Sequence, residues 1–217
     1  MRGMLSPPLA HPAPRPPTLT PLAHLAQTGL LRCAVPARMG GDGGGPADLA
    51  LAASLLLPRD TAAAAVFWAQ RLAIEALVQS PNVALRELWL PDLLGGERAG
   101  TLSPHTTPLT SQDTGRGWWL TGLLPDVPNR PWEGFSLVAP LRLGDAPAGW
   151  ALLRSEEDGL SALTDADQPA PRLATLALRR VYFREDEWLG EADLAVRMAP
   201  VASALAPFKP RTQAITA

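Results

Sequence analysis

The chain has 217 residues, of which 47% are apolar, and its formal net charge is −2. A chain of this length and composition can bury a substantial core, which excludes a disordered protein. The 19 basic residues are spread along the sequence rather than gathered in a run, so nothing predicts a surface for nucleic acid or an anionic membrane. Because no apolar run approaches the roughly 20 residues that cross a bilayer, we expect no membrane span.

The N-terminal segment, residues 1–20, is rich in proline and carries Arg2 and Arg15. Prolines interrupt the continuous apolar stretch that a secretory signal needs, so we interpret this segment as a flexible tail. Cys33 is the single cysteine, which favours a reducing compartment over a disulfide-forming one. A cytoplasmic location is therefore expected.

Capping residues and apolar periodicity predict four helices in the first half of the chain. Thr20 and Pro21 open the first, which we expect to reach Leu31, and Pro46 opens the second, which ends before Pro58. Asp60 precedes the third helix, where apolar residues recur at helical spacing as far as Val78. The fourth runs from Asn82 to a stop at Gly95 and Gly96.

After Gly96 the periodicity changes to that of strands. Four segments are rich in aromatic and branched residues and are separated by Gly, Pro and Asp: residues 117–124, 134–141, 149–153 and 172–183. Their short connections favour antiparallel pairing. The sequence therefore predicts an α+β protein with a flexible tail (1–20), a helical domain (21–98), a β-rich domain (99–195) and a C-terminal tail (196–217).

Several short motifs allow a functional and a structural interpretation. The glycines of residues 40–45 favour a turn over a phosphate-binding loop, because no Lys-Ser/Thr pair follows them. The three histidines stand far apart, so no metal site is predicted. Ser103, His105 and Asp113 could form a catalytic triad, but no nucleophile-elbow pattern surrounds the serine, and we predict no catalytic residue here. Seven tryptophans could line a ligand pocket or, more simply, fill the core.

The order of four segments resembles the acyl-CoA dehydrogenase family. They are residues 25–45 ("LAQTGLLRCAVPARMGGDGGG"), 81–103 ("PNVALRELWLPDLLGGERAGTLS"), 121–129 ("TGLLPDVPN") and 178–190 ("LRRVYFREDEWLG"). The resemblance covers residues 22–192. It implies an N-terminal α-helical domain followed by an antiparallel β-barrel-like domain, as in the front part of these enzymes.

By the same resemblance, FAD contacts are implied at Thr101, Ser103, Val127 and Asn129. The family's flavin motifs are degenerate in this chain, where Asp126 stands for a tryptophan and Pro128 for a threonine. Proline offers neither a hydroxyl nor an N–H group, and an aspartate brings negative charge towards a reduced, anionic flavin. We therefore expect FAD binding to be weak or lost.

The function implied by the resemblance is FAD-dependent α,β-dehydrogenation of an acyl-CoA. The family's catalytic glutamate lies in a C-terminal helical bundle that has no counterpart in this sequence, and Glu75 has no context that marks it as a base. We expect a homo- or hetero-oligomer with a chain that supplies the bundle, which would cover apolar surface left open around Val66, Phe67, Ile74 and Leu77. The alternatives are a non-catalytic subunit or pseudoenzyme that acts as an interaction module, and a flavin-dependent monooxygenase-like protein.

Overall fold

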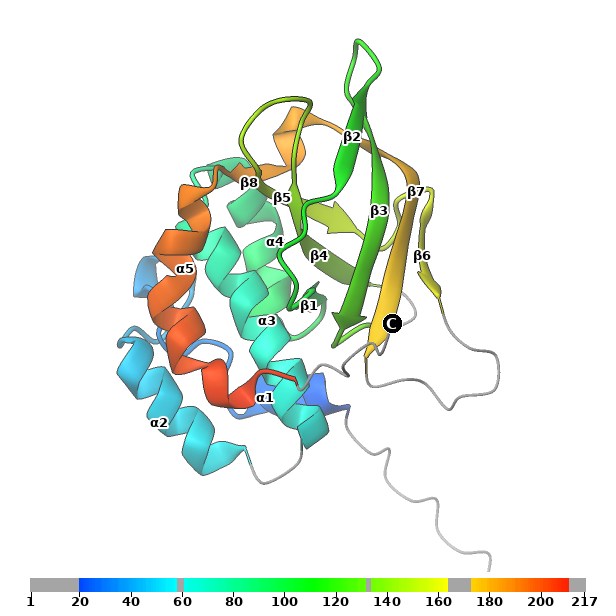
Figure 1. Cartoon of the computed structure of the whole chain (residues 1–217). Coiled ribbons are helices and arrows are strands. Elements are labelled where there is room, and N and C mark those ends of the chain that lie inside the picture. The colour runs from blue at the N-terminus through cyan, green and yellow to red at the C-terminus, as the bar shows by residue number, and fades with distance from the viewer. Residues whose placement is uncertain (1–19, 58–60, 132–133, 164–172, 211–217) are drawn as a thin grey trace, which may run out of the picture.

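The structure is a computed structural model, and it describes residues 20–57, 61–131, 134–163 and 173–210. Within these residues a layer of helices packs against one four-stranded sheet, and a second four-stranded sheet packs on the other face of the first (Figure 1). The predicted α+β class, with helices first and strands after, is confirmed. The β part forms two separate sheets rather than a closed barrel.

The helical layer begins with α1 (Pro21–Gln27) and a 3-10 turn (Ala37–Met39), followed by α2 (Pro46–Leu56), α3 (Thr61–Gln79) and α4 (Val83–Gly95). Thr20 caps α1 by accepting a hydrogen bond from the N–H of Ala23, as predicted. Asn82 caps α4 in the same way, through the N–H of Leu85. The first helix ends at Gln27, four residues before the predicted end. Asp60, the predicted cap of α3, lies outside the described residues.

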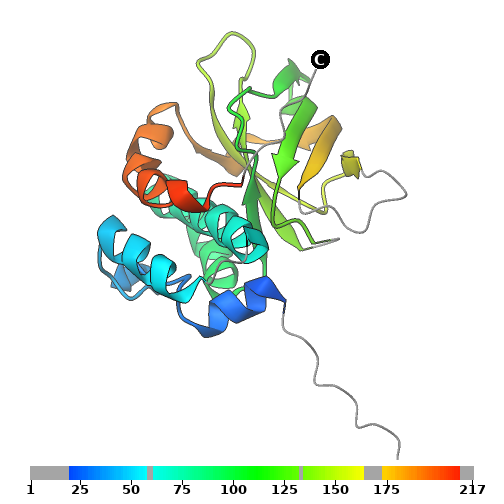
Figure 2. The same cartoon turned by 60° about the horizontal axis from the view of Figure 1, so that its bottom comes forward.

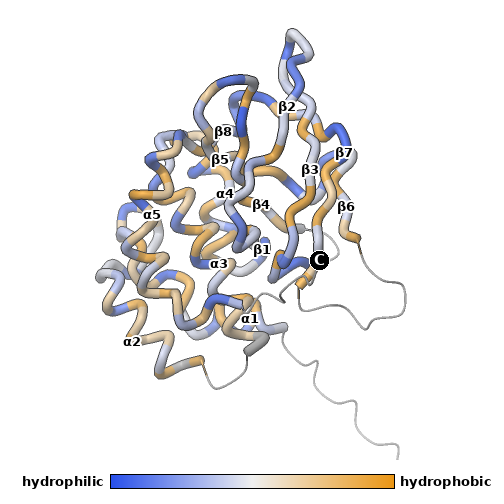
Figure 3. The backbone as a smooth tube through the Cα atoms, viewed as in Figure 1, coloured by the Kyte–Doolittle hydropathy of each residue, from blue (hydrophilic) through white to orange (hydrophobic). Residues whose placement is uncertain are grey.

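The strands are β1 (Ala99–Leu102), β2 (Thr110–Asp113), β3 (Trp118–Val127), β4 (Phe135–Leu141), β5 (Gly149–Arg154), β6 (Leu160–Leu163), β7 (Ala174–Phe183) and β8 (Trp188–Gly190). One sheet has the order β1-β4-β5-β8 and the other β2-β3-β7-β6. All pairs are antiparallel except β1 and β4, which run parallel. The long β3–β7 pair forms the centre of the second sheet, and the β2–β3 turn is its hydrophilic tip (Figure 3).

The C-terminal segment differs from its prediction. A proline-containing tail is expected from residue 196, but α5 (Asp193–Ala204) and a 3-10 turn (Ala206–Phe208) occupy most of it. Leu194, Met198, Val201 and Leu205 are buried on the inner face of α5, and this apolar spacing stabilises a helix despite Pro200. Residues 211–217 lie outside the described part.

α5 also removes the apolar surface that we expect on α3. Phe67, Ile74 and Leu77 are fully buried, and the ring of Phe208 meets that of Phe67 edge-on at 5.8 Å between centroids. Figure 2 shows α5 lying beside α3. The expectation of an open face at these three residues is therefore wrong, because a helix of the chain itself covers it.

Two apolar clusters form the core. One joins the helices to one face of β4 and β5, including Val138 and Leu152. The other fills the space between the two sheets, around Leu120, Leu137 and Phe183. Trp118, Trp150 and Trp188 pack at the borders of these clusters, which supports the structural interpretation of the tryptophans.

Candidate functional site

The four residues implied as flavin contacts lie together at one end of the β part. Thr101 is in β1, Ser103 follows β1, and Val127 and Asn129 are at the end of β3. The structure brings the two segments side by side, because the hydroxyl of Thr101 donates to the carbonyl oxygen of Pro128 and that of Ser103 to the carbonyl oxygen of Pro125, at 2.8 Å. We call residues 101–105 and 125–129 the crossing segments.

The backbone of the second crossing segment has an unusual conformation. Asp126 and Asn129 have φ values of 55° and 51°, in the left-handed region that aspartate and asparagine tolerate better than most residues. This conformation turns the carbonyl groups of Pro125 and Pro128 towards β1, where the two hydroxyls reach them. The residue types at 126 and 129 therefore suit the local backbone.

Gln70 connects the crossing segments to the helical layer. Its Oε1 accepts hydrogen bonds from the N–H of Gly100 at 2.6 Å and from Nδ2 of Asn129 at 2.9 Å. Its Nε2 donates to the carbonyl oxygens of Leu93 and Arg98. Gly100 is required here, because a Cβ on it would lie 2.5 Å from Cβ of Ala73. Gln70 was not predicted from the sequence, although a glutamine within the largely apolar run of α3 is the signal that could have revealed it.

The side chains of the crossing segments that are implied as flavin contacts are mostly buried. Thr101, Ser103 and Val127 are 0%, 5% and 1% exposed, so their side chains face the interior. The hydroxyl of Ser103 also accepts from the N–H of His105. Asn129 is partly exposed, but its Nδ2 is engaged with Gln70 and with the carbonyl oxygen of Gly100. The side-chain donors of Thr101, Ser103 and Asn129 thus all form hydrogen bonds within the chain.

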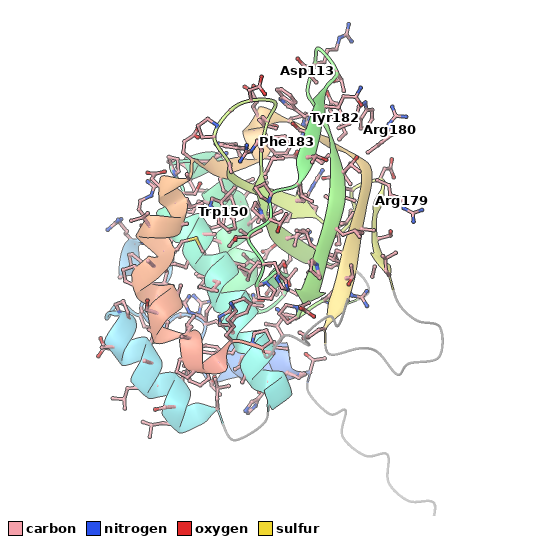
Figure 4. The ribbon with its side chains drawn as sticks, in the orientation of Figure 1. Asp113, Trp150, Arg179, Arg180, Tyr182 and Phe183 are labelled. Atoms are coloured by element: carbon pink, nitrogen blue, oxygen red, sulfur yellow. The ribbon has the colours of Figure 1, made fainter. Side chains whose placement is uncertain are left out.

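His105 and Asp126 lie at the more exposed edge of the crossing segments. Nε2 of His105 lies 2.9 Å from Oδ2 of Asp126, with the two side chains 40% and 18% exposed. Asp113, the third residue of the possible triad, is in β2 next to the β2–β3 turn (Figure 4) and has its Oδ1 bonded to the N–H of Gly115. No contact joins Ser103, His105 and Asp113 as a triad among the described residues.

Glu75, the one glutamate considered as a base, is enclosed in the helical layer. It is 3% exposed, and its Oε1 accepts from Nε2 of Gln79 at 2.8 Å. Burial raises the pKa of this carboxyl group, while Gln79 and the neighbouring Arg71 act in the opposite direction. Burial also lowers the pKa of Arg71 to about 10. These two groups belong to the interior of the helical layer and have no open path to a substrate.

Neither a metal centre nor a membrane-spanning helix is found in the described part of the chain. No group of three His, Cys, Asp or Glu residues there could hold a metal ion. No described helix combines the length and the apolar character that crossing a bilayer requires.

Comparison with known proteins gives a family for the N-terminal part. Residues 11–97 match the family described as "Acyl-CoA dehydrogenase, N-terminal domain". No curated protein matches the chain.

Solved structures of the same fold extend over both parts of the chain. A glutaryl-CoA dehydrogenase from Mycobacterium smegmatis in complex with FADH2 is 16% identical, with a TM-score of 0.73 over 86% of this chain and 52% of that one. The FAD complex of PigA is 18% identical, with a TM-score of 0.70 over 85% and 55%. The ChsE4-ChsE5 complex from Mycobacterium tuberculosis is 22% identical, with a TM-score of 0.62 over 81% and 48%.

The chain thus spans about half the length of these structural relatives. The family match ends at residue 97, where β1 is about to begin, and the structural likeness continues through the two sheets. Residues 11–97 therefore match the N-terminal domain family of acyl-CoA dehydrogenases, and the chain shares the fold of the helical and β domains of these solved structures.

Proposed function

We propose that this chain is an acyl-CoA dehydrogenase-like subunit that binds FAD weakly or not at all by itself. In this proposal, FAD-dependent α,β-dehydrogenation of an acyl-CoA takes place in a cytoplasmic complex, on a flavin and a catalytic base that a partner chain supplies. One observation carries the proposal: the donors of Thr101, Ser103 and Asn129 form hydrogen bonds within the chain.

Hydrogen-bond geometry explains why this observation counts against flavin binding. To reach a flavin, Thr101 and Ser103 would have to release the carbonyl oxygens of Pro128 and Pro125, and a buried acceptor left without a partner costs about 1–3 kcal/mol. Asp126 belongs to the second crossing segment, where its carboxylate contacts His105, and it would repel a reduced, anionic flavin. Both effects oppose binding of the cofactor by this chain.

The enclosure of Glu75, the single glutamate of α3, is the second support. Abstraction of a proton next to a thioester carbonyl needs a carboxylate within hydrogen-bond reach of the substrate. Glu75 is enclosed and bonded to Gln79, so it does not serve this role. The structure of the ChsE4-ChsE5 complex shows that a protein with this fold occurs in a complex of two named components, which supports the partner in our proposal.

The first test is the flavin content and activity of the purified chain. We expect a colourless protein, no saturable FAD binding by calorimetry at micromolar concentration, and no reduction of an artificial electron acceptor with short-chain acyl-CoA substrates. A chain that purifies with stoichiometric FAD and turns over an acyl-CoA alone would refute the proposal.

The second test concerns the partner. Affinity purification of the tagged chain from its own organism should yield a stoichiometric complex that contains FAD and oxidises an acyl-CoA. Turnover by the separated flavoprotein should fall when the chain is removed and return when it is added back. If the complex forms but its turnover is the same without this chain, the chain is a non-catalytic interaction module rather than part of the dehydrogenase.

A further inference from the structure

A cleft on the helical layer, which contains no residue of the crossing segments, has the composition of an anion-binding site. It has a volume of about 420 Å³ and lies between the 3-10 turn after α1 and one face of α4. Its lining consists of Arg32, Arg38, Met39, Gly40, Arg86, Glu87, Leu90, Pro91 and Leu94. We call this cleft the arginine cleft.

Two of its three arginines are held in place by backbone carbonyl groups. Nη1 of Arg32 donates to the carbonyl oxygen of Gly40 at 2.7 Å, and Nη1 of Arg86 donates to that of Ser80 at 3.0 Å. These bonds use one nitrogen of each guanidinium and leave other N–H groups available. A guanidinium fixed in this way loses little further side-chain entropy when it binds an anion.

None of the three arginines forms an ion pair with a carboxylate among the described residues. Arg38 is exposed and lies in the turn opposite α4. Among the described residues of the lining Glu87 is the single acidic one, so three arginines and one glutamate give this part of the cleft a net charge of +2. A phosphate monoester carries about −1.5 to −2 charges at pH 7, which matches this excess.

The floor of the cleft is apolar. Leu90 and Leu94 are 3% and 2% exposed, and Met39 lies beside them in the lining. A volume of 420 Å³ falls within the range of about 300–1,000 Å³ that is usual for small-molecule sites, and an apolar floor with a few charged groups is their usual composition. The cleft therefore has room for an organic body in addition to an anionic group.

From this combination we propose that the arginine cleft binds a small organic phosphate monoester. The phosphate lies among the guanidinium groups of Arg32, Arg38 and Arg86, and the apolar part of the ligand rests on Met39, Leu90 and Leu94. Arginine suits this role because its planar fork of N–H donors matches the oxygens of a phosphate group. The site is separate from the crossing segments, so it does not depend on whether FAD binds.

Titration with phenyl phosphate, followed by calorimetry at low ionic strength, tests the proposal on the full chain. We expect saturable binding at one site, weaker binding of inorganic phosphate, and no binding of phenol at the same concentrations. The difference between phenyl phosphate and inorganic phosphate measures the contribution of the apolar floor. The difference between phenyl phosphate and phenol measures the contribution of the charge. The proposal would be overturned if phenol bound as tightly as phenyl phosphate, or if phenyl phosphate showed no saturable binding.

Three variants identify the site. Arg38→Gln should weaken phenyl phosphate binding roughly tenfold, as expected for the loss of one charge-assisted contact. Arg179→Gln is the matched control, since Arg179 is an equally exposed arginine in β7 on the side of the sheet turned away from the helices (Figure 4). It should leave the affinity unchanged.

The third variant, Glu87→Gln, should tighten binding, because it removes the only negative charge of the lining. A change in this direction cannot result from damage to the fold, so it keeps the proposal testable if Arg38→Gln is poorly folded. Equal weakening by Arg38→Gln and Arg179→Gln would show that phosphate associates with the protein's arginines in general. Weaker binding in Glu87→Gln would show that the phosphate does not lie near Glu87. Either result would refute the site.

Discussion

The carboxylate of Glu156 accepts two hydrogen bonds from the guanidinium of Arg98, at 3.1 and 2.8 Å. The same guanidinium donates to Oγ of Ser136 and to the carbonyl oxygen of Phe135, both at 2.7 Å. It also stacks on the ring of Trp89 in α4, 4.5 Å from the ring centroid. Arg98 therefore joins α4, β4 and the loop after β5 at one point.

We expect Arg98→Ala to destabilise the protein by about 3 kcal/mol, because a buried guanidinium is removed and its acceptors lose their partner. Glu156→Gln should cost less than about 1 kcal/mol, since the carboxylate side chain is 51% exposed and exposed ion pairs contribute little. Urea denaturation at pH 7 measures both. Equal losses for the two variants would show that the ion pair with Glu156 provides the stability, rather than the contacts of Arg98 with Ser136, Phe135 and Trp89.

The acid side of the stability profile should depend on Glu156. The hydrogen bond from Arg98 is the main reason that the pKa of this carboxyl group is lowered to about 2. Since the folded-state pKa lies below the unfolded value of roughly 4.3, the contribution is present above the unfolded pKa and is lost as the pH falls towards 2. The stability difference between wild type and Glu156→Gln should shrink between pH 6 and pH 3.

The buried Arg71 and Glu75 should be replaceable by uncharged residues. Arg71 donates from Nη1 to the carbonyl oxygen of Leu31, but its Nε and Nη2 have no partner among the described residues. Replacing a buried charged pair by residues of similar volume is often neutral or stabilising. Arg71→Met with Glu75→Gln should therefore keep or raise the free energy of unfolding, whereas Arg71→Met alone should lower it, because Glu75 loses its attractive neighbour.

The pH dependence gives a second measure of the same pair. Burial raises the pKa of Glu75, so its contribution to stability is complete below the unfolded pKa and is lost as the pH rises through the folded-state pKa. Glu75→Gln should flatten the part of the profile above about pH 4.3. An unchanged slope in this variant would mean that Glu75 titrates normally in the folded protein.

Two valines of α5 provide a matched test of its packing. Val201 is 4% exposed and Val196 is 73% exposed on the same helix. Val201→Asp buries an unpaired charge and should cost roughly 3–5 kcal/mol. Val196→Asp should change the free energy of unfolding by less than about 0.5 kcal/mol. Chemical denaturation followed by circular dichroism distinguishes them, and similar stability of both variants would show that α5 does not cover α3 in solution.

The crossing segments constrain which residues can stand at position 126. Asp126 has a positive φ of 55°, which asparagine also adopts readily, whereas a bulky side chain is strained there. We expect Asp126→Asn to fold normally and Asp126→Trp to lose about 1–2 kcal/mol without gaining affinity for FAD. Tight FAD binding by Asp126→Trp, measured by flavin fluorescence, would show that the crossing segments can open.

The parts of the fold that local signals determine were predictable. Thr20 and Asn82 cap helices through contacts three residues away, and Gly96 ends α4 in a left-handed conformation with φ of 73°. The long β3 and β7 carry enough periodicity to be identified. The short β1 and β8 do not, because they are strands only by pairing with β4 and β5.

The rest depends on contacts between distant segments. α5 contains Pro200, which predicts a break, and the packing of its apolar face on α3, α2 and the strands β5 and β8 explains why the helix forms. At the candidate site, the segments that contain Thr101 and Asn129 were predicted from their resemblance to a flavin motif. In the structure the donor of Thr101 faces the carbonyl group of Pro128, and that of Asn129 faces Gln70. These inward contacts follow from the tertiary arrangement and not from local sequence.

The contact between Phe67 and Phe208 also has a consequence for biosynthesis. At translation rates of roughly 5–20 residues per second, Phe208 leaves the ribosome on the order of ten seconds after Phe67. During that interval the nascent α3 has no α5 to cover it, so its apolar face is available to chaperones or to other nascent chains. Expression yield should therefore respond to chaperone supply more strongly than the stability of the finished protein would suggest.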